Sequence, residues 1–286
     1  MKKKVSAPTL FGIIIGLLAA MLIAVLLINI ANAKEISELL NNGKKTEAEA
    51  LIEKHPGCLN TRPAYAPRWL ARFMDFPQSG YLLPDACSNG YYDTARRMAE
   101  LGADPNKGSF LKPLGAVLQD KHAGCYDMAV WLYEHGAKAE VVTDPWSLPE
   151  YSAIWAIAYT RAAEGCAEEE SEKLFDYFYE RIGNTIGTED SRSVDDWPLI
   201  MLLCAGNGHS GIIERILDKA LCDVNADSNG ETALMRAAAS GDTEIVQLLL
   251  SRGADKTKVD KDGFTALQYA EKYCKNPEAV IRLLSE

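Results

Sequence analysis

The sequence feature that most constrains the fold is an internal repeat, which is clearest after residue 200. Its period is about 33 residues, and periods of this size are typical of proteins that stack copies of one small supersecondary unit. A motif inside such a repeat must therefore be interpreted after the repeat itself. The identical residues that recur at this offset are Gly208 and Gly241, Ile212 and Ile245, Leu217 and Leu250, Asp227 and Asp260, Gly230 and Gly263, and Thr232 and Thr265.

One unit of the repeat predicts two short helices joined by a tight turn. Thr232 precedes the first helix, whose alanines at 237–239 let a neighbouring helix approach closely. Gly241 allows the turn, and apolar residues at 245–250 predict the second helix. Gly253 follows at the place where helices commonly end on a residue with positive φ. Because one hairpin cannot bury its apolar face alone, the units are expected to stack.

The repeat resembles the ankyrin repeat. The similarity rests on D-x-x-G-x-T-A-L at 227–234 and 260–267, and on G-A-D-P-N at 102–106. The resemblance implies an all-α solenoid of helix-turn-helix units that binds another protein and has no catalytic role. Met235 and Gln268 replace the histidine that usually follows the T-P-L triplet of the family. This replacement predicts weaker local hydrogen bonding at the two positions.

The expected domain organisation has four parts. Residues 1–9 form a short cytoplasmic segment, 10–30 an apolar helix, 34–64 a degenerate helical hairpin, and 65–286 the repeat domain. The units of the repeat domain are expected at about 65–108, 109–141, 148–188, 195–226, 227–259 and 260–286, with insertions between 109 and 195. The last unit has the polar face that is typical of a terminal cap.

The N-terminus predicts either an uncleaved signal anchor or a signal peptide. After Lys2-Lys3-Lys4, the stretch from residue 10 to residue 28 contains no polar side chain. As a helix this stretch would span about 28 Å, close to the ~30 Å core of a bilayer. Ala31-Asn32-Ala33 has the A-x-A pattern of a signal-peptidase site. Both interpretations put residues 34–286 outside the cytoplasm, in a bacterial periplasm, as a single-pass membrane protein or as a protein released after Ala33.

Gly206, Gly208 and Gly211 form a G-x-G-x-x-G motif that raises one enzymatic alternative. After a strand, such a turn binds the pyrophosphate of a dinucleotide, and Asp223 stands where a ribose ligand could lie. Residues 199–205 align with a helix of the repeat, however, so this remains a remote alternative. We expect no cofactor, metal or catalytic residue. The net charge of -10 also argues against nucleic acid as a partner.

The seven cysteines predict one candidate disulfide and leave at least one thiol unpaired within the chain. Cys125 and Cys166 each follow a glycine in the turn of consecutive units, so they could bridge adjacent repeats in an oxidising compartment. Cys87 and Cys204 are expected to be buried as small apolar residues. The chain contains no C-x-x-C motif, so a thiol-redox function is not expected.

The candidate binding residues lie in the turns between units. By the resemblance to ankyrin repeats, these turns project as fingers beside the inner helices and bind a partner protein, whose identity the sequence leaves open. The candidates are Asp144, Trp146, Asp195, Trp197, Asn229, Glu231, Asp262 and Phe264. The acidic run from 164 to 172 is expected to be a solvated helix start, with a patch for a basic partner as the alternative. The two functional alternatives are a scaffold that stays in the membrane and a cleaved effector or immunity-type inhibitor.

Overall fold

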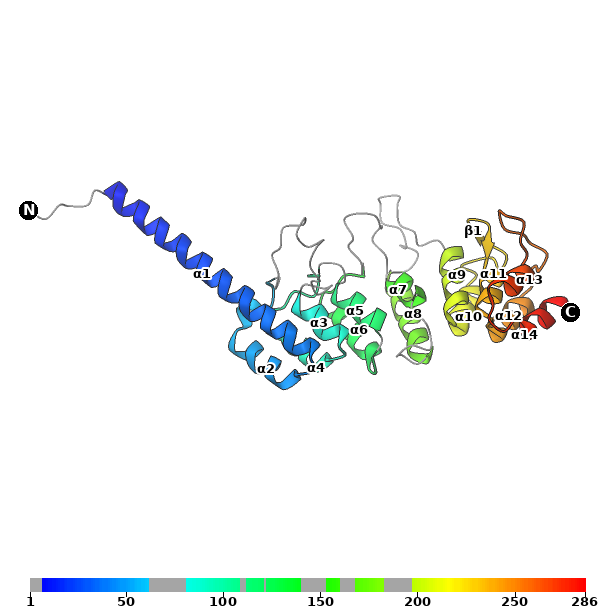
Figure 1. The fold of residues 1–286 in the computed structure, drawn as a ribbon, viewed down its shortest axis with the longest axis horizontal. Coiled ribbons are helices and arrows are strands. Elements are labelled where there is room, and N and C mark those ends of the chain that lie inside the picture. Colours follow the sequence, from blue (N-terminus) through cyan, green and yellow to red (C-terminus); the bar gives the residue numbers. More distant parts are fainter. Residues whose placement is uncertain are drawn as a thin grey trace, which may run out of the picture. The chain divides into compact units, whose positions relative to one another are not determined.

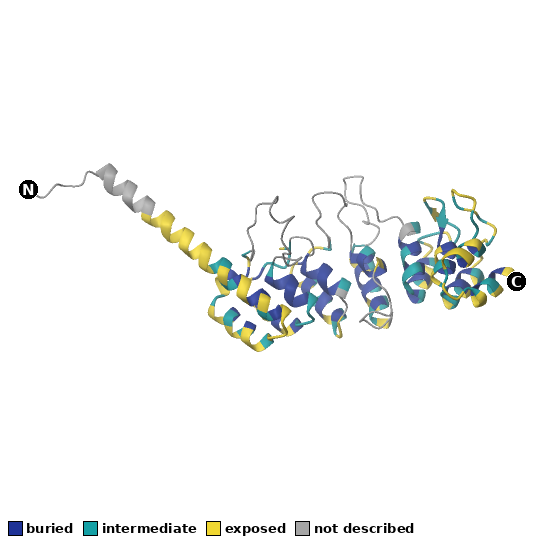
Figure 2. Cartoon of the chain, viewed as in Figure 1, coloured by how far each residue is buried: buried dark blue, intermediate teal, exposed yellow. Residues whose placement is uncertain are grey.

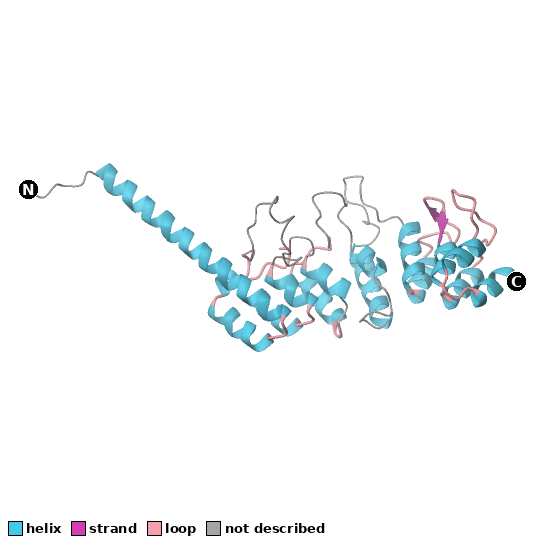
Figure 3. Cartoon of the chain, viewed as in Figure 1, coloured by secondary structure: helices cyan, strands magenta, loops and turns pink. Residues whose placement is uncertain are grey.

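The computed structural model describes residues 7–61, 81–108, 112–120, 122–139, 153–159, 168–182 and 197–286. The chain divides into two compact units, Met1–Ser109 and Phe110–Glu286, and each is described by itself. Helices dominate the described residues of both units, and the only strands there are two of two residues each (Figure 3). The expectation of an all-α fold is confirmed.

The first unit begins with a single long helix. It contains α1 (Ala7–Asn41), α2 (Lys45–Lys54), the short 3-10 helix η1 (Pro56–Cys58), α3 (Leu82–Ser88) and α4 (Tyr92–Glu100). The sequence analysis separated an apolar helix at 10–30 from a hairpin that starts at residue 34. In the structure α1 runs through that boundary without interruption (Figure 1). The reason is local: no glycine or proline lies between Leu17 and Gly43, and alanine is the best helix former.

The two ends of α1 have different surroundings. Near its C-terminal end, Ala33, Ile36 and Leu40 are fully buried against the rest of the unit, where α1 contacts α2, α3 and η1. From Leu17 to Ile28, the large apolar side chains are each 50–68% exposed (Figure 2). The segment Leu17–Asn41 has a mean hydropathy of 2.0 and is long and apolar enough to cross a membrane, as a signal sequence also is.

The second unit is built from helical hairpins in two layers. The first helices of the hairpins are α5 (Pro113–Asp120), α7 (Ala153–Tyr159), α9 (Trp197–Asn207), α11 (Ala233–Ser240) and α13 (Ala266–Tyr273). The second helices are α6 (Cys125–Glu134), α8 (Glu168–Ile182), α10 (Ser210–Asp218), α12 (Thr243–Ser251) and α14 (Glu278–Ser285). Each helix contacts the next one in its own layer, from α5 to α13 and from α6 to α14. We call these the inner and the outer layer.

In the last two hairpins, α11, α12 and α13 begin at side-chain caps, and α11 ends at a glycine. Thr232 precedes α11 and Thr265 precedes α13, and each hydroxyl accepts a hydrogen bond from the backbone N–H three residues later. Gln268 completes the second cap, because its Oε1 accepts from the N–H of Thr265 at 2.8 Å. The sulfur of Met235 takes the same role in the first cap at 3.5 Å. At position 268 the amide oxygen makes a short cap hydrogen bond, and the expectation of bonding weaker than that of the family's histidine stays a prediction.

Candidate functional site

The turn before α11 is a two-residue β-hairpin. The strands β1 (Asp227–Ser228) and β2 (Glu231–Thr232) pair antiparallel across Asn229 and Gly230. Both turn residues have positive φ, 58° and 88°, which is the geometry that an Asn-Gly pair adopts with least strain. The carboxylate of Asp227 accepts a hydrogen bond from the N–H of Gly230 at 2.8 Å. The side chain of Asn229 is consequently held at an exposed tip.

The next turn, before α13, is organised by the carboxylate of Asp260. Its Oδ1 accepts from the backbone N–H groups of Asp262 at 2.9 Å and Phe264 at 2.8 Å, and its Oδ2 from the hydroxyl of Tyr269 at 2.7 Å. The Tyr269 hydroxyl and these N–H groups stabilise the anion, so the pKa of Asp260 lies below its ordinary value. The turn presents Asp262 as an exposed side chain and Phe264 as a half-buried one.

The two fingers lie against each other. Lys261 Nζ donates to Asn229 Oδ1 at 3.3 Å. A Cβ on Gly230 would lie only 3.0 Å from Cγ of Lys261, so the close approach requires glycine there. Of the eight candidate binding residues, the structure thus brings together Asn229, Glu231, Asp262 and Phe264.

The other four candidates cannot be placed. Asp144, Trp146 and Asp195 lie outside the described residues. Trp197 is the first residue of α9, but its side chain is not among those described. Their role in binding stays a prediction.

The inner helices supply surface residues that the sequence analysis missed. On α11, Arg236 Nη2 lies 2.7 Å from the carboxylate of Glu231 and is about half exposed. On α13, Lys272 Nζ lies 4.5 Å from the ring centroid of Phe264 and 5.0 Å from that of Tyr273, within cation–π range. Tyr273 is 55% exposed. Cationic and aromatic groups of the inner layer therefore lie beside the fingers.

The period of the repeat is the sequence signal that could have identified these exposed residues of the inner helices. Three positions stay at least partly exposed on the inner helices, and they recur with the period of the repeat along α9, α11 and α13. We call these nine residues the inner-helix surface: Leu203, Arg236 and Tyr269; Gly206, Ala239 and Lys272; and Asn207, Ser240 and Tyr273.

The G-x-G-x-x-G motif runs from the end of α9 through the turn at Gly208 into the start of α10, and the residues before it form a helix and not a strand. Gly208 has φ of 86° and makes the turn. A Cβ on Gly206 would lie 3.0 Å from Cγ of Arg236, and one on Gly211 would overlap the carboxylate of Glu172. The glycines therefore make room for side chains of the neighbouring repeats. Because a carboxylate covers Gly211, this turn is unsuited to a pyrophosphate.

The outer layer is joined by arginines that pair with the preceding helix. Arg215 of α10 lies 3.0 Å from Glu172 and 2.8 Å from Asp176 of α8. Arg252 of α12 repeats the pattern toward α10, whose Glu214 and Asp218 lie at 3.6 and 2.6 Å. Because the arginines are about a third exposed, each pair contributes less than about 1 kcal/mol. Their role is to set the position of one repeat against the next.

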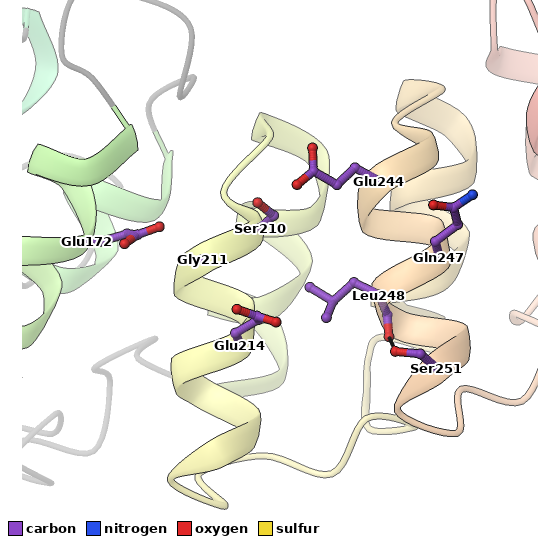
Figure 4. Close-up of a pocket in the computed structure, with 8 residues that line it drawn as sticks. All are labelled: Glu172, Ser210, Gly211, Glu214, Glu244, Gln247, Leu248 and Ser251. Carbon is purple, nitrogen blue, oxygen red and sulfur yellow. Dashed lines mark hydrogen bonds between the residues drawn. The ribbon is translucent and has the colours of Figure 1, made fainter.

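An open groove of about 550 Å³ lies along α8, α10 and α12, as Figure 4 shows. Its lining residues are Glu172, Ser210, Gly211, Glu214, Glu244, Gln247, Leu248 and Ser251. Two of the three carboxylates, Glu172 and Glu214, belong to the arginine pairs just described. Within the parts of the chain that the structure describes, no group of three His, Cys, Asp or Glu side chains is placed to hold a metal ion. The groove is accordingly a weaker candidate than the fingers.

The cysteines are mostly buried. Cys87 and Cys204 are fully buried, which confirms their interpretation as small apolar core residues. Cys125 begins α6 and is also fully buried, and its thiol donates to Glu170 at 3.2 Å. Cys166 lies outside the described residues. The Cys125–Cys166 bridge stays a prediction.

Comparisons with known proteins agree with the repeat architecture. Residues 164–260 and 201–286 match the family described as ankyrin repeats in three copies. Among solved structures, the chain is similar to the ankyrin repeat domain of human ASB11, with a TM-score of 0.56 and 17% sequence identity over 87% of this chain and 96% of that one. At this identity the similarity concerns the fold alone. The comparison with curated proteins found no significant match.

Proposed function

We propose that this chain, which belongs to the ankyrin-repeat family, binds a partner protein through the fingers and the inner-helix surface of its C-terminal repeats. Ankyrin repeats indicate a scaffold for protein–protein interaction. The binding is non-catalytic. The contact residues are Asn229, Asp262 and Phe264 of the fingers, and the exposed side chains beside them on α11 and α13. Asp144, Trp146, Asp195 and Trp197 would extend the same site toward the preceding units.

The observation that carries this proposal is that hydrogen bonds hold the fingers while side chains on and beside them stay exposed. The Asp260 carboxylate and the Lys261–Asn229 contact hold the fingers, while the side chains of Asp262 and Tyr273 stay exposed. A rigid surface loses little conformational entropy when a partner binds. Tyrosine and arginine are also enriched at interface hot spots, and Tyr273 and Arg236 are both exposed here.

We further propose that the repeats lie on the extracytoplasmic side of a membrane that α1 spans. The support is the Lys2-Lys3-Lys4 start, which favours a cytoplasmic N-terminus, and the exposed apolar side chains of α1. The packing around Ala33 favours retention over release. This last residue of the A-x-A motif is fully buried within a continuous helix, so cleavage there would cut into the packed part of the first unit.

Site-specific photo-crosslinking in the native membrane tests the binding surface. A crosslinking residue at position 229 or 273 should give one discrete adduct. The same residue at position 247, exposed on the outer helix α12, is the matched control and should give none. The adduct should disappear when Asp262→Lys is added. Equal adducts from all three positions would remove the fingers and the inner-helix surface as the site.

The topology is tested with intact cells whose outer membrane has been made permeable. A membrane-impermeant reagent should label a cysteine that replaces exposed Lys54 without detergent, and the protein should keep its full-length mass in the membrane fraction. Labelling only after lysis would place the repeats in the cytoplasm. A soluble chain that begins at Lys34 would identify the released form, whose partner could lie away from the membrane.

A further inference from the structure

The junction between the apolar part of α1 and the first hairpin contains no hinge. The helix continues from Ala7 to Asn41 in one piece, and sharp bends in helices almost always occur at a proline, a glycine–serine pair, a π-bulge or an inserted group. After Gly16 the next glycine is Gly43, beyond the end of the helix. The exposed apolar segment and the packed segment are therefore two halves of one rod.

The packed half is locked to the hairpin that follows it. Ile36 and Leu40 are fully buried, and between them the hydroxyl of Ser37 donates to Asp85 of α3 at 2.7 Å. One turn later, Asn89 Nδ2 donates to Asn41 Oδ1 at 3.1 Å. These contacts repeat on one face of α1 at the spacing of helical turns. They fix both the rotation of α1 and its position along its own axis relative to α3.

The same packing brings one edge of the unit to the level where the apolar surface ends. The last large apolar residue that is exposed in the segment is Ile28, and Asn29 follows it. The chain turns at Gly43 and returns along α2 to η1. A Cβ on Gly57 of η1 would lie 3.7 Å from the side-chain amide of Asn29. The α2–η1 end therefore lies level with the first polar residue after the apolar segment.

We propose that α1 is a rigid strut that seats the α2–η1 end of the first unit on the lipid headgroups and holds that unit at a set height and rotation above the membrane. The occupant of the apolar half is a bilayer and not a helical partner, because the large side chains are exposed all around the helix and not along one stripe. The inference rests on the proposed membrane placement and adds to it a rigid connection. Partners of the first unit would then be presented within reach of the membrane surface.

Insertions after Ile28 test the strut in the full chain, reconstituted in a bilayer. One insertion is a helix-forming heptapeptide of Glu, Ala and Lys, which would add about 10 Å and almost two complete turns. The matched control is a heptapeptide of Gly and Ser, which is flexible. A fluorescent residue at exposed Lys54, near the α2–η1 end, reports energy transfer to an acceptor on the lipid headgroups. The same residue at exposed Glu38, about 13 Å further along α1 from Asn29, is the second reporter.

The strut predicts strong transfer at position 54 and weaker transfer at position 38. The helical insert should move both reporters away from the headgroups by about the length of its two turns and preserve the difference in their distances. The flexible insert should broaden the fluorescence lifetimes and reduce that difference. Equal behaviour of the two inserts, with the chain still resistant to carbonate extraction, would overturn the strut alone. Extraction of the unmodified chain by carbonate would overturn the membrane placement, and the strut with it.

Discussion

The hydroxyl of Ser37 on α1 donates a hydrogen bond of 2.7 Å to the carboxylate of Asp85 on α3, and both side chains are almost completely buried. Burial raises the pKa of Asp85 to about 6, although the hydrogen bond from Ser37 acts in the opposite direction. The contact that joins the long helix to the next hairpin therefore contains a carboxyl group that is costly to ionise.

The stability of the first unit should consequently fall as the pH rises from about 4 to about 6. The unfolded chain loses the Asp85 proton near the ordinary pKa of 3.8, while the folded chain holds it up to about 6. The stabilisation from this group is therefore complete below about 3.8 and is lost as the pH passes 6. The size of the effect is about 3 kcal/mol between the two limits.

Asp85→Asn provides the measurement. Asparagine keeps an oxygen that can accept a hydrogen bond from Ser37, and it cannot ionise. As the pH rises from 4 to 7, the free energy of unfolding of the variant should therefore increase relative to that of the wild type by up to about 3 kcal/mol. Urea unfolding of a chain that begins at Asn29, at a series of pH values, gives this difference. Ser37→Ala is the companion, because the loss of the hydrogen bond should raise the pKa of Asp85 further. If the free energies of unfolding of Asp85→Asn and the wild type differ by the same amount at pH 4 and pH 7, the raised pKa of Asp85 is contradicted.

The glycines of the G-x-G-x-x-G motif should differ sharply in how they tolerate alanine. Gly208 has φ of 86°, so Gly208→Ala should cost about 1–2 kcal/mol. Gly211 is helical, and an added Cβ there meets the mobile end of Glu172. Gly211→Ala should change stability by less than about 1 kcal/mol, because the helix gain offsets the disturbed Glu172–Arg215 pair.

Thermal or urea unfolding of the two variants separates the roles. Glu172→Ala combined with Gly211→Ala removes the overlap and is the control for it. A dinucleotide turn would instead use Gly208 for the close approach of the backbone to the pyrophosphate, so Gly208→Ala would abolish a thermal shift by NAD. Any such shift in the wild type would contradict the interpretation of these glycines as spacers between repeats.

The sequence analysis predicted the C-terminal hairpins well because their fold is local. Gly241 and Gly253 adopt the positive φ that their positions in the repeat required, and residues 245, 246 and 249 of the apolar stripe are fully buried. A unit that contacts only its neighbours leaves this regular trace in one sequence.

The features that the repeat pattern did not predict depend mainly on tertiary contacts. The continuity of α1 was missed, because the A-x-A motif suggested a boundary where alanines in fact continue the helix. The fit of Gly211 to Glu172 joins two repeats at a separation that differs from the repeat period. The inner helices were expected behind the fingers, but their exposed residues were not predicted, because the family motif marks the turns and not the exposed positions of the helices.

A chain that begins at Lys34 should have a less stable first unit than a chain that begins at Asn29. The shorter chain lacks Ala33, which is fully buried, half-buried Ile30, and the Asn29 side chain that lies against Gly57. The apolar area that the truncation exposes should lower the free energy of unfolding of the first unit by about 1–2 kcal/mol. Faster hydrogen exchange should appear in α2 and η1, while α11 and α12 of the second unit, the internal control, should keep their rates. Equal exchange in α2 would show that cleavage after Ala33 leaves the first unit intact.

Tyr269→Phe should loosen the second finger without unfolding the repeat. The hydroxyl of Tyr269 is the largest cause of the lowered pKa of Asp260, and the substitution leaves the carboxylate with its backbone donors only. The pKa of Asp260 should therefore rise toward its ordinary value. Because a lowered pKa stabilises the folded state above that ordinary value, the variant should also lose less stability on acidification than the wild type.

Carboxyl NMR titration measures this pKa directly, and amide exchange of residues 262–264 reports the order of the finger. Tyr273→Phe is the matched control, because Tyr273 lies one turn further along α13, whereas the donors to Asp260 are Tyr269 and the backbone. If the finger is part of the binding surface, Tyr269→Phe should also weaken the photo-crosslink from position 229, because that position lies next to Lys261 of this finger. An unchanged pKa of Asp260 would show that the backbone donors alone hold the carboxylate, and that the inner helix does not position the finger.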